Sequence, residues 1–344
     1  MVDILKYSVG IDVSSEDLAV GFGLLSRNLL SKISKPKKFT NTKKGFKSMD
    51  NWITKQRKVK ETRLGIVMEA TGVYHENVAH FLYKKGYEIY VVLPYKAKRY
   101  LESLGNRSKN DPIDSIGLTQ MGIDQQNLER WHPPSPIMMT LRGLTRQRQQ
   151  LQELITSDNN RLHAVQSGFH DAKAVKKLLR SRIRFYKKQV QQIELDIITT
   201  LKEQPQLATK VERIVQSIKG IGLLTMVTLI AETNGFQYFH SIQQITKYAG
   251  YDVIENQSGK FKGRERISKK GNSRIRRILH MPALNMVTFG TGTFPSLYQR
   301  IYEKSGIKMK GYVAIQRKLL CLLFTLWKKD EIFDPNFKSK LSNK

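Results

Sequence analysis

A short stretch near the N-terminus sets the strongest limit on how this chain can fold. Tyr7-Ser-Val-Gly-Ile-Asp-Val13 alternates apolar residues with small or polar ones, which is the period of a strand with one buried face. The apolar residues share that face, so Asp12 lies on the opposite face, in the middle of the strand. Turn residues and a second apolar run, Leu18–Leu25, follow directly. The stretch therefore predicts a β-hairpin that begins a sheet.

Strands and helices then alternate along the chain. Apolar spacing predicts helices at residues 43–57, 73–85 and 97–104, and strands at 63–68 and 87–93. This alternation after an opening hairpin is typical of an α/β layer domain. The proline-rich break Trp131-His-Pro-Pro-Ser-Pro136 is the best domain boundary. We therefore expect the α/β domain to occupy residues 1–135.

Four acidic residues stand out in a chain with 59 Lys+Arg, 29 Asp+Glu and a net charge of +30. Asp12 lies on the first strand, Glu69 follows a later one, and Asp111 and Asp114 open a helix whose first turn contains a proline. In that helix the two carboxylates share a face, about 5–6 Å apart at Cβ, and can bind one hard cation together. Each acid alone could be an ordinary solvated or capping residue. Their joint placement predicts convergence at one sheet edge.

Beyond the break, apolar residues at helical spacing predict two long helices, which we assign to a coiled-coil, basic region over residues 136–205. Between residues 173 and 188 the region has eight Lys/Arg and no acid. A solvated helix face is the ordinary explanation, but this asymmetry favours a phosphate-binding face. The candidates for that face are Lys173, Lys176, Lys177, Arg180 and Arg184.

The last region, residues 206–344, is expected to be mostly helical. Residues 214–231 resemble a helix-hairpin-helix element, in which Gly220 and Gly222 expose backbone N–H groups to a phosphate, although a tight turn has the same pattern. Residues 259–277 hold nine Lys/Arg, one acid and three glycines, which predicts a flexible, anion-binding loop before a helix at 273–284. The candidate phosphate contacts of this segment are Lys260, Lys262, Arg264, Arg266, Lys269, Lys270 and Arg274.

The composition of the chain indicates which class of molecule it binds. The positive charge and a pI of about 10.1 favour a polyanion, with nucleic acid as the first choice. The sequence has no apolar run long enough to span a bilayer and no signal-peptide pattern, so a membrane is not expected as a partner. The single cysteine, Cys321, rules out an internal disulfide and suits a reducing compartment. We expect a cytoplasmic, nucleoid-associated protein.

The acidic motifs together carry a family resemblance. Gly-Ile-Asp12-Val-Ser, Met-Glu69-Ala-Thr-Gly and Lys-Asn-Asp111-Pro-Ile-Asp114 resemble the RuvC-like DEDD domain of the IS110-family transposases. The basic loop resembles the serine-bearing signature of the same family's C-terminal transposase domain. The resemblance implies an α/β plus α architecture: an RNase H/RuvC-like N-terminal domain, a central coiled coil and a mostly helical transposase domain.

The resemblance also implies a reaction, in which DNA strands are cut and rejoined. Mg²⁺ or Mn²⁺ would be held by Asp12, Glu69, Asp111 and Asp114, and Ser258, in Ser-Gly-Lys, matches the family's nucleophile. Ser268, in Ile-Ser-Lys-Lys-Gly-Asn, is the rival nucleophile, although it suits a cap of the next helix. The implied partners are target and donor DNA, a structured bridge RNA that guides the reaction, and further copies of the chain in a dimer or tetramer.

Two other functions remain open from the residues. One is a RuvC-type metal-dependent nuclease or junction resolvase, in which water attacks the phosphate and Ser258 is only a loop residue. The other is a non-catalytic nucleic-acid-binding scaffold. A stable protein–DNA adduct separates the transposase from the first alternative, and metal-dependent strand cleavage rules out the second.

Overall fold

The structure is a computed structural model that describes residues 3–70, 72–105, 111–169, 172–254, 257–258, 261–263, 266–290 and 292–334. The chain divides into two compact units, residues 1–133 and 134–344, and the division lies within the proline-rich break. Each unit has its own hydrophobic core, so each is described by itself.

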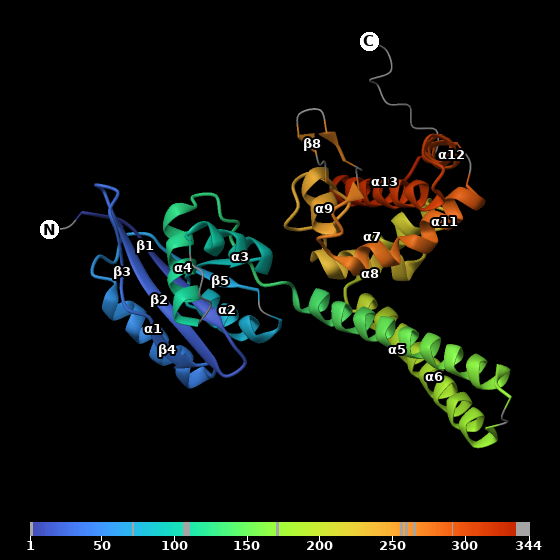
Figure 1. Ribbon diagram of the computed structural model, residues 1–344, viewed down its shortest axis with the longest axis horizontal. Coiled ribbons are helices and arrows are strands. Elements are labelled where there is room, and N and C mark those ends of the chain that lie inside the picture. The colour runs from blue at the N-terminus through green and yellow to red at the C-terminus, as the bar shows by residue number, and fades with distance from the viewer. Residues whose placement is uncertain are drawn as a thin grey trace, which may run out of the picture. The chain divides into compact units, whose positions relative to one another are not determined.

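The N-terminal unit is built on a six-stranded mixed sheet (Figure 1). Its strands are β1 Ile4–Val13, β2 Asp17–Ser26, β3 Ser31–Ile33, β4 Lys37–Thr40, β5 Leu64–Glu69 and β6 Glu88–Val92. The order is β3-β2-β1-β5-β6, and β4 also pairs with β2. β1 and β2 form the expected antiparallel hairpin, whereas β1, β5 and β6 run parallel. The expected α/β domain is confirmed, and its sheet is mixed.

Helices cover both faces of this sheet. The helices of this unit are α1 Lys43–Gln56, α2 Tyr74–Lys84, α3 Pro94–Ser103 and α4 Asp111–Asp124. The apolar residues of β1 pack against α1 and α2, and the opposite face packs against α3 and α4. Pro94 not only ends the strand but also begins α3, because its fixed φ suits the first helical turn.

The C-terminal unit is mostly helical. Its helices are α5 Pro136–Ser167, α6 Lys173–Lys202, α7 Pro205–Ser217, α8 Leu223–Thr233, α9 Ile242–Ala249, α10 Ser273–Ile278, α11 His280–Thr288, α12 Thr293–Ser305 and α13 Lys308–Lys329. α5 and α6 lie side by side and antiparallel (Figure 1), joined by the ion pairs Arg148–Glu194 and Arg182–Asp158. One apolar core links α7 to α13 with the near ends of this helical hairpin. Whether the hairpin supercoils stays a prediction.

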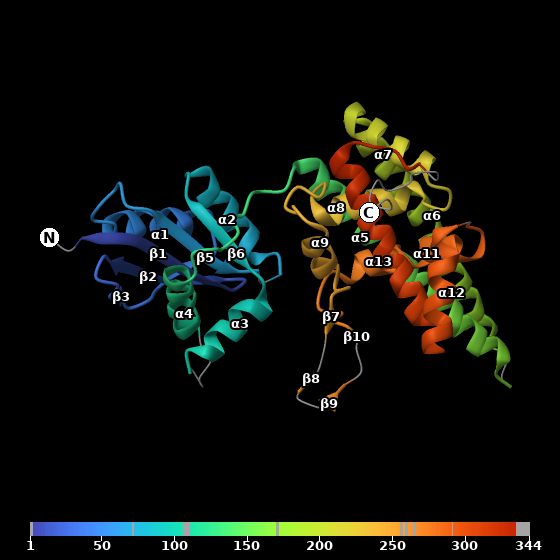
Figure 2. The same cartoon turned by 90° about the horizontal axis from the view of Figure 1, so that it is seen from above.

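The basic segment before α10 differs from the expected loop. Two short antiparallel ladders form there, β7 Val253–Ile254 with β10 Arg266–Ile267, and β8 Gln257–Ser258 with β9 Phe261–Lys262. They extend away from the helices of the unit (Figure 2). The single helix expected at 273–284 is two helices, because the chain breaks at Leu279 between α10 and α11.

Candidate active site and nucleic-acid interface

Helix α4 lies unusually close to the centre of the sheet, and glycine makes this possible. Gly10 of β1 and Gly21 of β2 are register partners. A Cβ at Gly10 would come within 2.2 Å of the Thr119 backbone nitrogen, and one at Gly21 within 2.5 Å of the Thr119 hydroxyl. The Gly10 N–H donates to that hydroxyl (3.0 Å), and the Ser8 hydroxyl donates to the Thr119 carbonyl (2.8 Å). The small residues of β1 therefore fix α4 directly on the strand that carries Asp12.

The four predicted acids lie on three elements that this packing brings together. β1 and β5 are parallel neighbours with Ile11 opposite Met68, so Asp12 and Glu69 follow at adjacent positions near the ends of their strands. Asp111 and Asp114 occupy the first turn of α4. Asp12, Glu69 and Asp114 are half-buried and Asp111 is exposed. Each acid lies on the element expected from the sequence, and the joining of the four into one metal site stays a prediction.

Three of the four acids act on the pKa of the fourth, Asp12. Burial and then the carboxylates of Asp114, Asp111 and Glu69 raise the pKa of Asp12 from 3.8 to about 6, against a smaller lowering by the Val13 backbone N–H. Carboxylate oxygens are the donors that Mg²⁺ and Mn²⁺ prefer, so the residue types fit such an ion. Among the described residues no group of three or more His, Cys, Asp or Glu is already arranged to hold a metal.

The two candidate serines lie in the basic segment of the other unit. Ser258 is on β8, where it pairs with Phe261. Ser268 follows β10; its hydroxyl donates to the Asp252 carboxylate and accepts from the Lys270 N–H. The cap expected at Ser268 is wrong, because the Asn272 side chain caps α10.

The basic candidates around these serines are only partly described. Lys260 and Arg264 lie outside the described residues, and Lys262 is placed through its backbone alone. Arg266, Lys269 and Lys270 are exposed, and Arg274 is half-buried at the start of α10. The exposed members present several cations close together along a few residues of backbone, which suits a phosphate chain.

Two further predicted surfaces belong to helices. Gly220, with φ +100°, makes the turn between α7 and α8, and Gly222 is the N-cap of α8; both are exposed. On α6, Lys173, Lys177, Arg180 and Arg184 are exposed and Lys176 is half-buried. Arg182, on the same helix, pairs with the buried Asp158 of α5 and so stabilises the hairpin instead.

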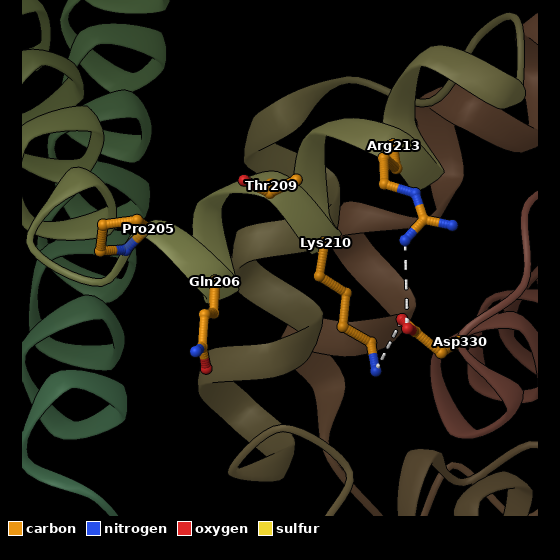
Figure 3. Close-up of a pocket in the computed structure, with 6 residues that line it drawn as sticks. All are labelled: Pro205, Gln206, Thr209, Lys210, Arg213 and Asp330. Carbon is orange, nitrogen blue, oxygen red and sulfur yellow. Dashed lines mark ion pairs between the residues drawn. The ribbon is translucent and has the colours of Figure 1, made fainter.

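A separate hollow of about 470 Å³ lies beside α7 (Figure 3). In it, Lys210 and Arg213 both pair with Asp330 at the end of α13, at 3.2 and 4.0 Å. It is lined by none of the candidate residues above.

Sequence reasoning missed Glu232, a buried carboxylate in the apolar helix α8. Its side chain is 1% exposed and accepts two hydrogen bonds from Arg146 and one from Asn272. The available signal was an acid at the end of the otherwise apolar run 223–231.

An acidic sheet edge in one unit and a basic, serine-bearing segment in the other define the class as proteins that process nucleic acids. Comparison with known proteins makes this specific. The DEDD model of IS110 transposases matches residues 9–171, and the model described as transposase of the IS116/IS110/IS902 family matches residues 212–299. The chain therefore belongs to the IS110 family of transposases, and the resemblance seen in the sequence is confirmed. It is a DNA recombinase whose DEDD domain implies dependence on a divalent metal.

Two curated relatives match over nearly the whole chain. They are the pilin gene-inverting proteins of Moraxella bovis and Moraxella lacunata, each 27% identical over 331 residues, which is 96% of this chain and 98% of the relative. Two RuvC structures from Thermus thermophilus, one in complex with a Holliday junction substrate, align with 37% and 36% of this chain and 99% of RuvC. Their identities are 9% and 10% and their TM-scores 0.28 and 0.27. In the described ranges, no helix is long and apolar enough to cross a membrane.

Proposed function

We propose that this recombinase cuts and rejoins DNA with a DEDD metal site and a serine nucleophile. The observation that carries the metal site is the joint effect of Glu69, Asp111 and Asp114 on the pKa of Asp12. Four carboxylates that repel one another on a stable sheet edge are costly unless a cation neutralises them. Mg²⁺ or Mn²⁺ is the proposed ion.

The chain's own residues have separate roles in this proposal. Asp12 and Glu69, on neighbouring strands, would supply oxygen ligands to the metal, and Asp111 and Asp114 would supply two more from α4. When bound, the metal would supply charge neutralisation at the scissile phosphate. The depth at which α4 packs on Gly10 sets the spacing between the two pairs of ligands.

Ser258 is the proposed nucleophile, because it matches the family's serine motif and lies in the cationic segment. Its oxygen forms a bond to phosphorus as the bond to the departing deoxyribose oxygen breaks, and the hydroxyl proton passes to a substrate or solvent base. Arg266 and Lys269 are exposed cations that can bind the non-bridging oxygens. The phosphoserine link conserves the bond energy, so reversal of the step with a second DNA end rejoins the strand.

Such a conservative reaction suits what the curated relatives are named for, the inversion of a gene segment. Inversion cuts and rejoins strands without net loss of DNA, so we extend it to this chain as a proposed outcome. From the family resemblance we also propose that a structured RNA selects the target and donor DNA, and that the active protein is a dimer or tetramer. The exposed cations of α6 provide a surface for such a nucleic acid.

The metal site is tested by substitution and by chelation. Asp12→Ala, Glu69→Ala, Asp111→Ala and Asp114→Ala should each abolish strand transfer and leave nucleic-acid binding intact, and a chelator should have the same effect on the wild-type protein. Asp17→Ala, which removes the half-buried ion-pair partner of Lys38 at the start of the neighbouring strand β2, is the matched control and should stay active. Activity within tenfold of wild type for Asp12→Ala and Glu69→Ala would sink the proposal.

The nucleophile is tested by trapping. Denaturing a reaction should leave protein joined to a cut DNA end through an alkali-labile phosphoserine, and peptide mapping should locate the nucleotide on Ser258. Ser258→Ala should bind DNA and form no adduct, whereas Ser268→Ala should still form one. A nucleotide on Ser268 would transfer the role to that residue, and cut ends with no adduct at any time would favour attack by water.

A further inference from the structure

The buried carboxylate of Glu232 joins three helices of the C-terminal unit. Arg146 of α5 donates two hydrogen bonds to it, at 2.7 and 2.9 Å, and the Asn272 amide donates a third at 2.7 Å. The Tyr248 hydroxyl of α9 donates to the Glu232 backbone carbonyl (3.0 Å), and the Asn272 N–H donates to the Tyr248 carbonyl (2.7 Å). The long helix α5 is thereby linked to the residue that immediately precedes α10.

The chemistry of these groups fixes the orientation of the Asn272 side chain. A carboxylate only accepts hydrogen bonds, so it must face the NH₂ group of Asn272. The amide oxygen of Asn272 must then face the other way, where it accepts from the N–H groups of Arg274 and Ile275 and caps α10. Burial opposes ionisation of Glu232, but the hydrogen bonds from Arg146 and Asn272 hold its pKa below the ordinary value, so the acceptor is ionised at neutral pH.

A buried ion pair is a poor way to gain stability, since apolar residues of similar size often serve as well. Its better attested use is to select one arrangement over others. Here the selected arrangement is the end of the basic segment and the first turn of α10, where Arg274 and the exposed Lys269 and Lys270 lie.

We propose that Glu232 is a positioning residue: by orienting Asn272, it sets the geometry with which the basic segment meets the DNA phosphate. The inference rests on the proposed role of that segment in strand cleavage. It predicts that the polarity of the Glu232–Asn272 hydrogen bond, rather than the mere presence of the two side chains, determines the rate of the chemical step.

Two single substitutions with almost no change of shape test this. Glu232→Gln lets the amides of residues 232 and 272 compete over which one donates. Asn272→Asp keeps a good N-cap but sets one carboxylate against another. Each should lower the single-turnover rate constant for strand cleavage about tenfold or more, as expected when reacting groups are misplaced by a fraction of an ångström to an ångström. The substrate is a supercoiled plasmid that carries the gene for this chain with its flanking DNA.

The double variant Glu232→Gln/Asn272→Asp is the decisive arm. In it, the residue at 232 donates to the residue at 272, which still caps α10, so this hydrogen bond is restored with reversed polarity, while Arg146 keeps only one of its two hydrogen bonds to residue 232. Its rate constant should therefore lie above those of both single variants and below that of the wild type. The control is Glu153→Gln, which removes the exposed ion pair of α5 with Arg277 and should change the rate less than twofold.

The amplitude of the cleavage reaction distinguishes a mispositioned basic segment from a simple loss of folded protein. A destabilised variant has fewer active molecules, so its cleavage amplitude falls at an unchanged rate constant, whereas a mispositioned segment gives full amplitude at a lower rate. Hydrogen exchange at the Arg274 and Ile275 amides should quicken in both single variants and recover in the double variant. Wild-type rate constants in both single variants, or no recovery in the double variant, would overturn the inference.

The failure of the proposed nucleophile remains distinguishable in the same samples. Wild-type cleavage without a serine adduct would count against Ser258, while the order of the rate constants would still decide the role of Glu232. Should Glu232→Gln fail to fold, Asn272→Asp and the double variant give the same comparison.

Discussion

Removing the charge of Asp12 should make the N-terminal unit more stable while it abolishes the proposed chemistry. In the folded chain, burial and three neighbouring carboxylates raise the pKa of Asp12 from 3.8 to about 6. The folded state therefore takes up a proton below about pH 6, where the unfolded chain does so only near pH 4. The ionised carboxylate thus opposes folding above pH 6, and this cost disappears as the pH falls toward 4.

The size of the effect follows from the same values. Each pKa unit corresponds to about 1.4 kcal/mol, which sets an upper limit of about 3 kcal/mol for a rise of about two units. Asp12 is only half-buried, and solvent screens its repulsion, so we expect Asp12→Asn to gain about 1 kcal/mol at pH 7.5 without metal. The gain should vanish near pH 4. Added Mg²⁺ should stabilise the wild-type protein more than the variant, because only the wild type has all four proposed ligands.

The stability of the N-terminal unit must be measured by itself, since the chain has two compact units. Urea-dependent hydrogen exchange of the β1 amides gives the free energy for opening the sheet. Asp17→Asn is the matched control: it removes a partner of Lys38 at 2.6 Å and should be neutral or slightly destabilising. A variant Asp12→Asn that is no more stable than wild type at pH 7.5, or whose gain does not change with pH, would refute the electrostatic reasoning.

Three further outcomes are expected. Gly10→Ala should destabilise the N-terminal unit by about 3 kcal/mol, because its Cβ meets the Thr119 backbone, whereas Gly143→Ala on α5, with open space around it, should be neutral or stabilising by about 0.5–1 kcal/mol; urea-dependent exchange measures both. Replacing Lys176, Lys177, Arg180 and Arg184 with Glu should weaken DNA binding. It should also reduce the slope of log K against log salt by about 0.9 for each phosphate that these side chains no longer neutralise. An unchanged slope would show that this face is only a solvated surface. Lowering the pH through the depressed pKa of Glu232 should destabilise the C-terminal unit, because that carboxylate is stabilised only while ionised; Glu232→Gln should lack this component of the acid sensitivity when both proteins are unfolded in urea across pH 3–6.

The sequence by itself determined the elements of the N-terminal unit. The alternation in residues 7–13 predicts a strand with one apolar face, and in the structure Tyr7, Val9 and Ile11 are buried against α1 and α2. Period-2 and period-3.6 patterns are visible in the sequence because the residues on one face of such an element all pack on the same core. The positions of the four acids could also be predicted, because each position depends only on the strand or helix that carries the acid.

The tertiary structure alone decided what lies on the other face of that strand. From the sequence, Ser8 and Gly10 look like the solvent-facing positions of the strand. In the structure the backbone of α4 packs directly against them. The sequence does not show this, because the partner, Thr119, is more than a hundred residues away. The same limit applies to the start of α10: Ser268 and Asn272 are both good caps by sequence. Asn272 takes the role because α10 begins at Ser273, while the Ser268 hydroxyl is bonded to Asp252. The contact of the Asn272 amide with Glu232, which is buried on another helix, is likewise visible only in the folded chain.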